Sequence, residues 1–304
     1  MPTLSVILAT YNEEKNIKDC LESVKWADEI VIVDGSSVDK TVEIAKKYTN
    51  KIFVRENPLM FHINKQIAIE KATGEWILYL DADERVAKEL KEEILSTLKK
   101  PAFTGYWIPR RNIIFGKWIK HAGWYPDFQL RLFKNGKAYL PCKSVHEQPV
   151  LKGKAGYLKT DLIHFNYRTV AQFVRKLNEL YTENDKNVFL AQGKKVSPLD
   201  AIRFPKNEFL KRFFREEGYK DGLHGLVLSL LQSFSALVLF AKLWEEQGFK
   251  EEQAPSFFKK AVSEFKKSFQ EFRYWSLKTE ILGKDKNFLR ELWFKIKLKV
   301  PLIL

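Results

Sequence analysis

The sequence predicts an α/β fold in which helices cover both faces of a mostly parallel sheet, with a helical C-terminal extension. Its first 100 residues alternate short apolar runs with amphipathic helical patterns, as β-α-β units do. The apolar runs are nearly continuous, which is typical of strands buried on both faces. Beyond residue 170 the patterns are mostly helical. With 304 residues the chain is long enough for an ample core.

The predicted elements of the first 100 residues follow in order from the N-terminus. LSVILA predicts a first strand at 4–9, and a helix follows it with Asn12 as the expected N-cap. The later elements alternate in the same way: strands at 29–34, 51–56 and 75–81, and helices at 38–48 and 62–72. Ligands of such sheets bind beyond the carboxyl ends of the strands, so polar residues at these ends are candidate site residues.

The regular alternation stops at residue 101. Aromatic, Gly- and Pro-containing segments such as GYWIPRRNIIFGKWIK fill residues 101–165, which predicts a mixed-sheet extension and loops that cover the site. Helical patterns return at 170–190 and 222–246.

Charge and cysteine content narrow the class of protein. The formal net charge is +14, and residues 1–100 carry 15 Lys and Arg against 18 acids, whereas the remainder carries 37 against 20. Nucleic acid, an anionic membrane surface or a phosphorylated substrate would each suit this basic excess. The two cysteines, Cys20 and Cys142, lack metal or redox spacing, and the N-terminus lacks the features of a signal peptide. We therefore expect a cytoplasmic protein without disulfides.

Two helical segments in the last third have features of membrane contact. The segment 222–246 approaches transmembrane length; His224 and Gln232 argue against insertion of residues 223–241, whereas flanking Lys and Arg favour it. A core or interfacial helix is the preferred interpretation. Residues 257–272 place phenylalanines at helical spacing with lysines between them, as in a basic helix lying on a membrane. An ordinary helix packed on the domain explains this second pattern equally well.

The candidate chemistry gathers at strand ends. Asp34 ends the second strand, and Asp81 and Asp83 form a D-x-D at the end of the fourth. Carboxylates suit Mg²⁺ or Mn²⁺, and a metal held by so few protein groups needs a diphosphate to complete its coordination. Neither G-x-G-x-x-G nor G-x-x-x-x-G-K-[ST] occurs, which argues against a dinucleotide dehydrogenase and a P-loop kinase.

Longer motifs point to a known family. The first 90 residues contain LSVILATYNEEKNIKDCLESVKWADEIVIVDGSSVDKTVEIAKKY and KATGEWILYLDADERV. Both resemble the nucleotide-sugar half of the family-2 glycosyltransferases, which have the Rossmann-like GT-A fold. Further along lie GYWIPRRNIIFGKWIKHAGWYPDFQLRLF, VHE and DGLHGLVLSLLQSFSALVLFAKLWE. These are similar to the bacterial lipopolysaccharide inner-core subgroup, whose members are glucosyltransferases acting on core heptose.

The resemblance covers residues 3 to about 247 and implies three regions. These are a nucleotide-sugar-binding half at 1–100, an acceptor-side half at 101–215, and a helical, basic amphipathic region at 216–304. DGSSVD stands where the subgroup usually has D-S-G-S-T-D, and Gln66 stands where Asn is usual, so the preference for base or sugar could differ.

The resemblance also assigns roles to residues of the donor side. Tyr11 should stack beside the nucleobase, Asp34 should accept a hydrogen bond from it, and Arg131 should neutralise phosphate charge. The complete set of implied nucleotide-sugar-binding residues is Ala9, Tyr11, Glu13, Asp34, Lys65, Asp81 and Arg131.

The implied reaction is an inverting transfer with Mg²⁺ or Mn²⁺ as the cofactor. Asp83 resembles the main metal ligand, with Asp81 and His146 as further candidate ligands. One carboxylate must take the proton of the acceptor hydroxyl while the metal absorbs charge on the departing diphosphate. Asp127, in YPDFQLRLF, occupies the position that resembles the family's base, and Glu147, in VHE, is the alternative base.

The expected partners follow from the same resemblance. They are a nucleotide-sugar donor, with a UDP-sugar favoured, and a lipid-linked saccharide acceptor such as the lipopolysaccharide core. The basic region would lie on the anionic inner face of the cytoplasmic membrane as a peripheral contact. A polyprenyl phosphate or a surface polysaccharide is the alternative acceptor. A basic nucleic-acid-binding protein is disfavoured, because that function leaves the clustered acids unexplained and they would repel phosphates.

Overall fold

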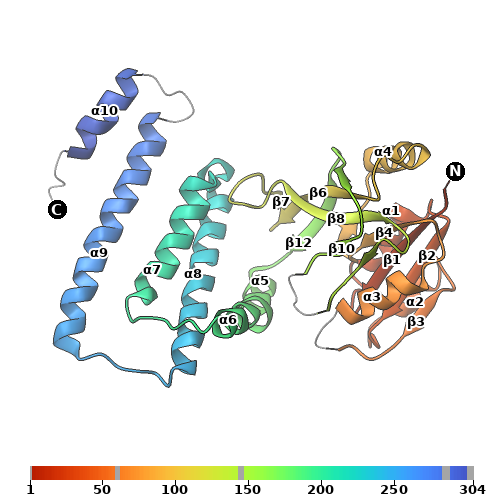
Figure 1. Ribbon diagram of the computed structural model, residues 1–304, viewed down its shortest axis with the longest axis horizontal. Helices are drawn as coiled ribbons and strands as arrows, with labels where there is room; N and C mark the ends of the chain where they lie inside the picture. Colours follow the sequence, from red (N-terminus) through yellow and green to blue (C-terminus); the bar gives the residue numbers. More distant parts are fainter. Residues whose placement is uncertain (1, 59–61, 143–146, 283–287, 300–304) are drawn as a thin grey trace. The chain divides into compact units, whose positions relative to one another are not determined.

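The computed structural model describes residues 2–58, 62–142, 147–282 and 288–299 (Figure 1). The chain divides into two compact units. The sheet unit comprises residues 1–120 and 124–170, and the helical unit comprises residues 121–123 and 171–304. The predicted α/β fold with a helical C-terminal extension is confirmed.

The N-terminal part of the sheet unit is parallel, as predicted. Its strands lie in the order β3-β2-β1-β4, and every neighbouring pair is parallel. The strands are β1 (Leu4–Thr10), β2 (Glu29–Asp34), β3 (Ile52–Val54) and β4 (Trp76–Leu80). The helices that alternate with them, and the one that follows β4, are α1 (Ile17–Val24), α2 (Thr41–Ala45), α3 (His62–Lys71) and α4 (Lys88–Lys99). This arrangement brings the carboxyl ends of all four strands to one edge.

Helices cover both faces of this sheet because alternate strand residues point to opposite sides. Leu78 and its neighbours on the same face pack in one core with the buried residues of α1 and α4. Ile77 belongs to a second core, which includes Ala68 and Ile69 of α3. Nearly every residue of β1, β2 and β4 is therefore buried, in agreement with their continuous apolar sequence.

Beyond β4 the sheet becomes mixed, as predicted for residues 101–165. Its strand order continues as β4-β8-β6-β12-β5, and β8 is antiparallel to both β4 and β6. These strands are β5 (Glu84–Arg85), β6 (Gly105–Ile114), β8 (Asp127–Lys134) and β12 (Leu162–Tyr167). The short strands are β7 (Lys117–Trp118), β9 (Ala138–Tyr139), β10 (Val150–Leu151) and β11 (Ala155–Tyr157).

The link between β4 and β5 closes this part of the sheet on itself. Only Asp81, Ala82 and Asp83 separate the two strands in sequence, although β8, β6 and β12 separate them in the sheet. The sheet must curl to bring β12 back beside β5, where His164 and Glu84 are in register. The D-x-D acids thus lie in the segment that joins the two ends of the curl.

The helical unit is built around the long apolar helix α8. Its helices are α5 (Val170–Lys176), α6 (Thr182–Ala191), α7 (Asp200–Phe209), α8 (Leu223–Glu246), α9 (Ala254–Leu277) and α10 (Phe288–Lys299). Figure 1 shows α7 beside α8, and the chain approaches α8 closely at Gly225. A Cβ atom at Gly225 would lie 1.7 Å from the Gly218 carbonyl oxygen, so only glycine fits there.

The predicted start of the first helix is wrong. Asn12 is not an N-cap, because α1 begins at Ile17. Asn12 instead adopts a φ of 55°, and its side-chain oxygen accepts a hydrogen bond from the Val38 N–H at 3.0 Å. A turn therefore separates β1 from α1.

In the described part of the chain, α8 is the one helix that has the length and apolar composition needed to cross a membrane. Only 22% of the 18-residue apolar stretch of this helix is buried. Leu228 and Leu243 are buried, whereas Leu223, Leu230 and Phe234 are exposed.

Candidate active site

The first polar group lies at the carboxyl ends of β1 and β2. Asp34, the last residue of β2, is fully buried. Its carboxylate accepts hydrogen bonds from the Thr10 hydroxyl at 2.8 Å and from the backbone N–H and hydroxyl of Ser37, each at 2.7 Å. These bonds fix the carboxylate in the turn that follows β2.

Three other predicted donor-side residues share this edge. The Tyr11 side chain is 46% exposed, as an aromatic ring must be if a ligand is to stack on it. Glu13 accepts a hydrogen bond from Asn16 Nδ2 at 2.7 Å. Ala9 lies within β1, in register with β2. The edge therefore offers one exposed ring, in the residue that follows Thr10, whose hydroxyl bonds the Asp34 carboxylate.

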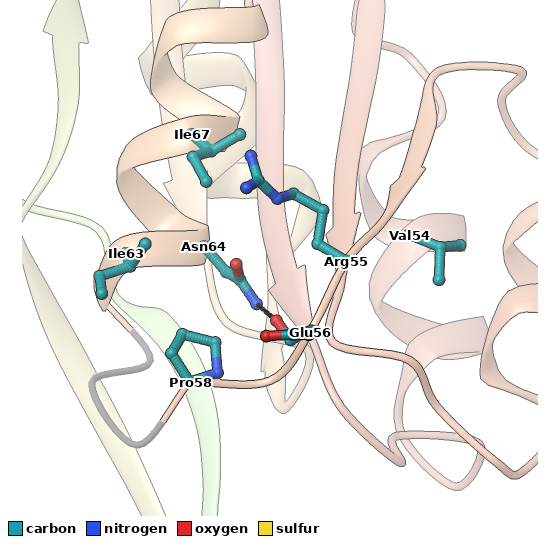
Figure 2. Close-up of a pocket in the computed structure, with 7 residues that line it drawn as sticks. All are labelled: Val54, Arg55, Glu56, Pro58, Ile63, Asn64 and Ile67. Carbon is teal, nitrogen blue, oxygen red and sulfur yellow. Dashed lines mark hydrogen bonds between the residues drawn. The ribbon is translucent and has the colours of Figure 1, made fainter.

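A pocket of about 470 Å³ opens beside the Asp34 turn. Arg55, which lines it, donates its backbone N–H to the Asp34 carbonyl at 2.8 Å. Figure 2 shows the pocket between the segment after β3 and the first turns of α3, where Asn64 Nδ2 donates to the Glu56 carbonyl at 3.1 Å. The lining residues are Val54, Arg55, Glu56, Pro58, Ile63, Asn64 and Ile67.

Asp81, directly after β4, lies between two cations. Lys65 of α3 donates to Asp81 Oδ1 at 2.5 Å, and Arg131 of β8 donates to Oδ2 at 2.6 Å. Burial raises the pKa of the Asp81 carboxyl, but the two cations outweigh burial and hold this pKa well below its usual range. Asp81 is therefore an ionised group with a protein donor on each oxygen.

Glu84 of β5 extends this series of charges. It is fully buried, accepts a hydrogen bond from Arg131 Nη2 at 2.7 Å, and lies 3.5 Å from Arg110 Nη1. Arg110 donates from Nε and Nη2 to Asp127 Oδ2 at 2.9 and 2.6 Å. Opposite charges therefore alternate from Asp81 to Asp127, and this pairing compensates the cost of burying them.

Asp127, the candidate base, begins β8. Besides its contacts with Arg110, its carboxylate accepts hydrogen bonds from Gln129 Nε2 at 2.7 Å and from Asn112 Nδ2 at 3.1 Å. Burial raises the pKa of the Asp127 carboxyl, but the Arg110 charge and these hydrogen bonds bring it below its usual value. The carboxylate is thus ionised at neutral pH, as a proton acceptor must be.

Asp83 faces a histidine that the sequence analysis did not single out. His164 of β12 is buried, and its Nε2 lies 3.5 Å from Asp83 Oδ2. Its other ring nitrogen, Nδ1, lies 2.7 Å from Asn112 Oδ1. A carboxylate oxygen and an imidazole nitrogen so placed suit a shared divalent cation, with the second ring nitrogen bonded to the protein.

Four of the predicted residues, Lys65, Asp81, Arg131 and Asp127, belong to this one series of contacts. Arg131 is only 4% exposed, and its guanidinium bonds Asp81 and Glu84. The alternative base Glu147 is half-buried. His146 lies outside the described residues. Among the residues that are described, no group of three or more His, Cys, Asp or Glu side chains could hold a metal.

Four site residues were not among those predicted: Glu84, Arg110, Asn112 and His164. The signal available for three of them was polar residues at alternate positions of a strand. His164 and Asn166 stand at such positions on β12, and Arg110 and Asn112 do so on β6, where Arg111 lies between them. Polar residues at alternate positions share one face of a strand, and a buried polar face needs partners.

A comparison with protein families explains this combination of motifs. The family described as Glycosyl transferase family 2 matches residues 5–195. The chain belongs to glycosyltransferase family 2. The protein is therefore a glycosyltransferase, and the resemblance inferred from its motifs is confirmed.

Named relatives of this glycosyltransferase come from several bacteria. The lipopolysaccharide core biosynthesis glycosyltransferase LpsC of Rhizobium meliloti (strain 1021) is 29% identical over 255 residues, which are 81% of this chain and 94% of LpsC. The uncharacterized glycosyltransferase RT0209 of Rickettsia typhi is 28% identical over 261 residues, covering 81% and 88% of the two chains. The structure of S. aureus TarS 1-349 in complex with UDP-GlcNAc covers 77% of this chain and 81% of that chain, at 18% identity and a TM-score of 0.42.

Replacing Glu84 by Gln should lower the free energy of unfolding by about 3 kcal/mol, because Arg131 and Arg110 each lose one of their two carboxylate partners and the series is left with more cations than anions. Urea denaturation followed by circular dichroism measures this change. The matched control is Glu92→Gln, since Glu92 is exposed and lies 4.0 Å from Lys88. We expect the control to change stability by less than about 0.5 kcal/mol. Equal effects of the two substitutions would contradict a special role for Glu84.

Proposed function

We propose that this glycosyltransferase transfers a sugar with inversion from a nucleotide-sugar donor, a UDP-sugar being favoured, to a lipid-linked saccharide acceptor. The lipopolysaccharide core is the favoured acceptor, because LpsC bears that function in its name. The observation that carries the proposal is the continuous series of contacts from Asp81 to Asp127. This series supports the proposal because it links Asp81 and Asp127, to which we assign the donor side and the acceptor side, in one network of contacts.

The donor half of the proposal rests on the edge formed by β1, β2 and β3. Tyr11 would stack on the base, Asp34 would accept a hydrogen bond from it, and the adjoining pocket at Arg55 would receive part of the nucleotide. A thermal-shift screen of UDP, GDP and ADP sugars with Mn²⁺ identifies the base, since a bound ligand raises the melting temperature.

Asp83 and His164 are the residues of this chain that would hold the Mg²⁺ or Mn²⁺. Asp81 already carries Lys65 and Arg131 on its oxygens, whereas Asp83 faces an imidazole nitrogen 3.5 Å away. Asp81 would then contact the ribose or a water of the metal. The bound metal would neutralise charge on the departing diphosphate.

The acceptor half of the proposal assigns the base role to Asp127. Its carboxylate would take the proton of the acceptor hydroxyl as the hydroxyl oxygen attacks the anomeric carbon. The bond between that carbon and the diphosphate breaks, and the diphosphate leaves with the electron pair, so the configuration inverts. Arg110 would keep Asp127 ionised and in place. Radiolabelled donor offered with truncated core lipid and with polyprenyl phosphate separates the two candidate acceptors.

Replacing Asp83 by Asn should reduce sugar transfer by at least roughly 100-fold, because the substitution removes an anionic metal ligand. The same variant should lose Mn²⁺ binding in the presence of UDP, as measured by electron paramagnetic resonance. Its melting temperature should stay within a few degrees of the parent. An active Asp83→Asn protein that still binds Mn²⁺ would remove Asp83 from the metal site.

The base assignment is tested by comparing Asp127→Asn with Glu147→Gln. We expect Asp127→Asn to lower kcat by roughly 10²- to 10⁴-fold, since a general base contributes about that factor, while donor binding is retained. Glu147→Gln should change kcat by only a few-fold. The opposite ranking in steady-state assays would move the base role to Glu147.

A membrane contact is proposed for one face of α9. Phe258, Phe265 and Phe269 are 69%, 61% and 43% exposed, and their spacing places them on one side of the helix. Lys259 and Lys266 are exposed next to them in sequence. We name these five residues the α9 face. Aromatic rings flanked by lysines suit the interface of an anionic membrane.

Other residues hold α9 on the helical unit. Arg203 of α7 donates to Glu264 at 3.0 Å, and Phe272 stacks on Phe209 with ring centroids 6.3 Å apart. The α9 face could therefore meet lipid while the helix stays packed, which supports the proposed contact with the inner face of the cytoplasmic membrane.

The triple variant Phe258→Ser, Phe265→Ser, Phe269→Ser should bind vesicles of phosphatidylcholine and phosphatidylglycerol roughly tenfold or more weakly than the parent, because apolar burial is lost. Co-sedimentation measures this binding. Val38→Ser combined with Tyr157→Ser is the control, since these exposed residues lie on the sheet unit. Unchanged sedimentation of the triple variant would rule out the α9 face, and a change in oligomeric state would indicate a protein partner instead.

A further inference from the structure

We propose that Asn112 is a positioning residue that orients two groups of the active site at once. On one side it holds the Asp127 carboxylate, and on the other it fixes which ring nitrogen of His164 faces Asp83. The inference rests on the proposed function, in which Asp127 is the base and Asp83 and His164 hold the metal.

Asn112 occupies the position in the sheet from which both groups can be reached. It is fully buried on β6, which lies between β8 and β12. Asn112 is in register with His164 of β12, and Asp127 of β8 pairs with Arg110, two residues away on β6. Because Arg110 and Asn112 point to the same face of the strand, both contact Asp127.

The orientation of the Asn112 amide follows from its neighbours. Nδ2 lies 2.8 Å from the Trp124 carbonyl and 3.1 Å from Asp127 Oδ2. Both neighbours are acceptors only, so a flipped amide would bring its oxygen against two oxygens and lose both hydrogen bonds. The Asn112 Oδ1 atom must therefore face His164, where it also lies 3.4 Å from Asn166 Nδ2.

This orientation sets the tautomer of His164. Since Asn112 Oδ1 is an acceptor at 2.7 Å, His164 Nδ1 must carry the hydrogen. The Nε2 atom of the neutral ring then presents a lone pair to Asp83 Oδ2, 3.5 Å away. Two lone-pair-bearing atoms that face one another suit a cation between them. The Asn112 amide thus orients His164 at the proposed metal site and Asp127 at the proposed acceptor site.

The tautomer is tested first on the metal-free protein. Long-range ¹H–¹⁵N spectra recorded at about pH 9, where a histidine is neutral, distinguish the two tautomers. His164 is assigned by the loss of its signals in His164→Gln. We expect a protonated Nδ1 and an unprotonated Nε2. A protonated Nε2 would overturn the assignment, whether or not the protein proves to be an active enzyme.

Two substitutions at position 112 then separate the two contacts. Asn112→Asp keeps an oxygen for His164 but replaces the donor to Asp127 by a second carboxylate. Asn112→Leu removes both contacts. With Mn²⁺ and UDP bound, pulsed electron paramagnetic resonance should detect histidine nitrogen coupling in the parent and in Asn112→Asp, with none in His164→Gln and a weaker coupling in Asn112→Leu.

The kinetic result should differ from the spectroscopic one. Asn112→Asp should lower kcat roughly tenfold or more while the KM for the donor stays within about twofold, because only the base is misplaced. Asn135→Asp is the matched control, since the Asn135 amide also donates to two carbonyls, those of Ala72 and Gly74, both at 3.0 Å. It should affect stability and leave kcat unchanged.

Each half of the inference has its own contrary result. Full kcat in Asn112→Asp would overturn the link to Asp127, and undiminished nitrogen coupling in a folded Asn112→Leu would overturn the link to His164. Failure of the proposed function looks different. It would appear as a parent protein that binds no Mn²⁺ or as an Asp127→Asn variant with full activity, and the tautomer measurement would still stand.

Discussion

The buried carboxylate of Glu84 is the constraint on which the rest of the site depends. A fully buried anion is tolerated only when cations reach it, and Arg131 and Arg110 do so from β8 and β6. Each arginine has further donors, which extend to Asp81 and to Asp127. The two arginines that compensate the charge of Glu84 therefore also hold Asp81 and Asp127.

Much of the fold could be predicted from the sequence because the first 100 residues follow simple rules. A continuous apolar run such as 29–34 becomes a parallel strand with its predicted limits intact. The turn after β1 was misjudged because Asn is favoured both as an N-cap and at positive φ, and Asn12 takes the second option. The curl between β4 and β5 could not be foreseen, because it depends on pairing between strands that are far apart in sequence.

The candidate site was predictable to a similar extent. Asp34, Asp81 and Asp83 stand at strand ends, where topology alone makes them neighbours. Residues such as Asn112 and His164 lie inside strands, and their contact depends on the register of β6 against β12. A sequence shows that such residues are polar and share a face, but it does not show which residue lies opposite. The partners of Glu84 could not be predicted for the same reason, since its two arginines come from two other strands.

The short link between β4 and β5 joins the geometry of the reaction to the integrity of the sheet. An inserted or deleted residue there would change the spacing of Asp81 and Asp83 and would also shift β5 against β12. Loops elsewhere on the sheet can gain or lose residues at small energetic cost. This link cannot change length without disturbing both the spacing of the two acids and the pairing of β5 with β12. Evolution of this enzyme towards new donors or acceptors must therefore proceed through the surrounding loops, with the acidic link retained at fixed length.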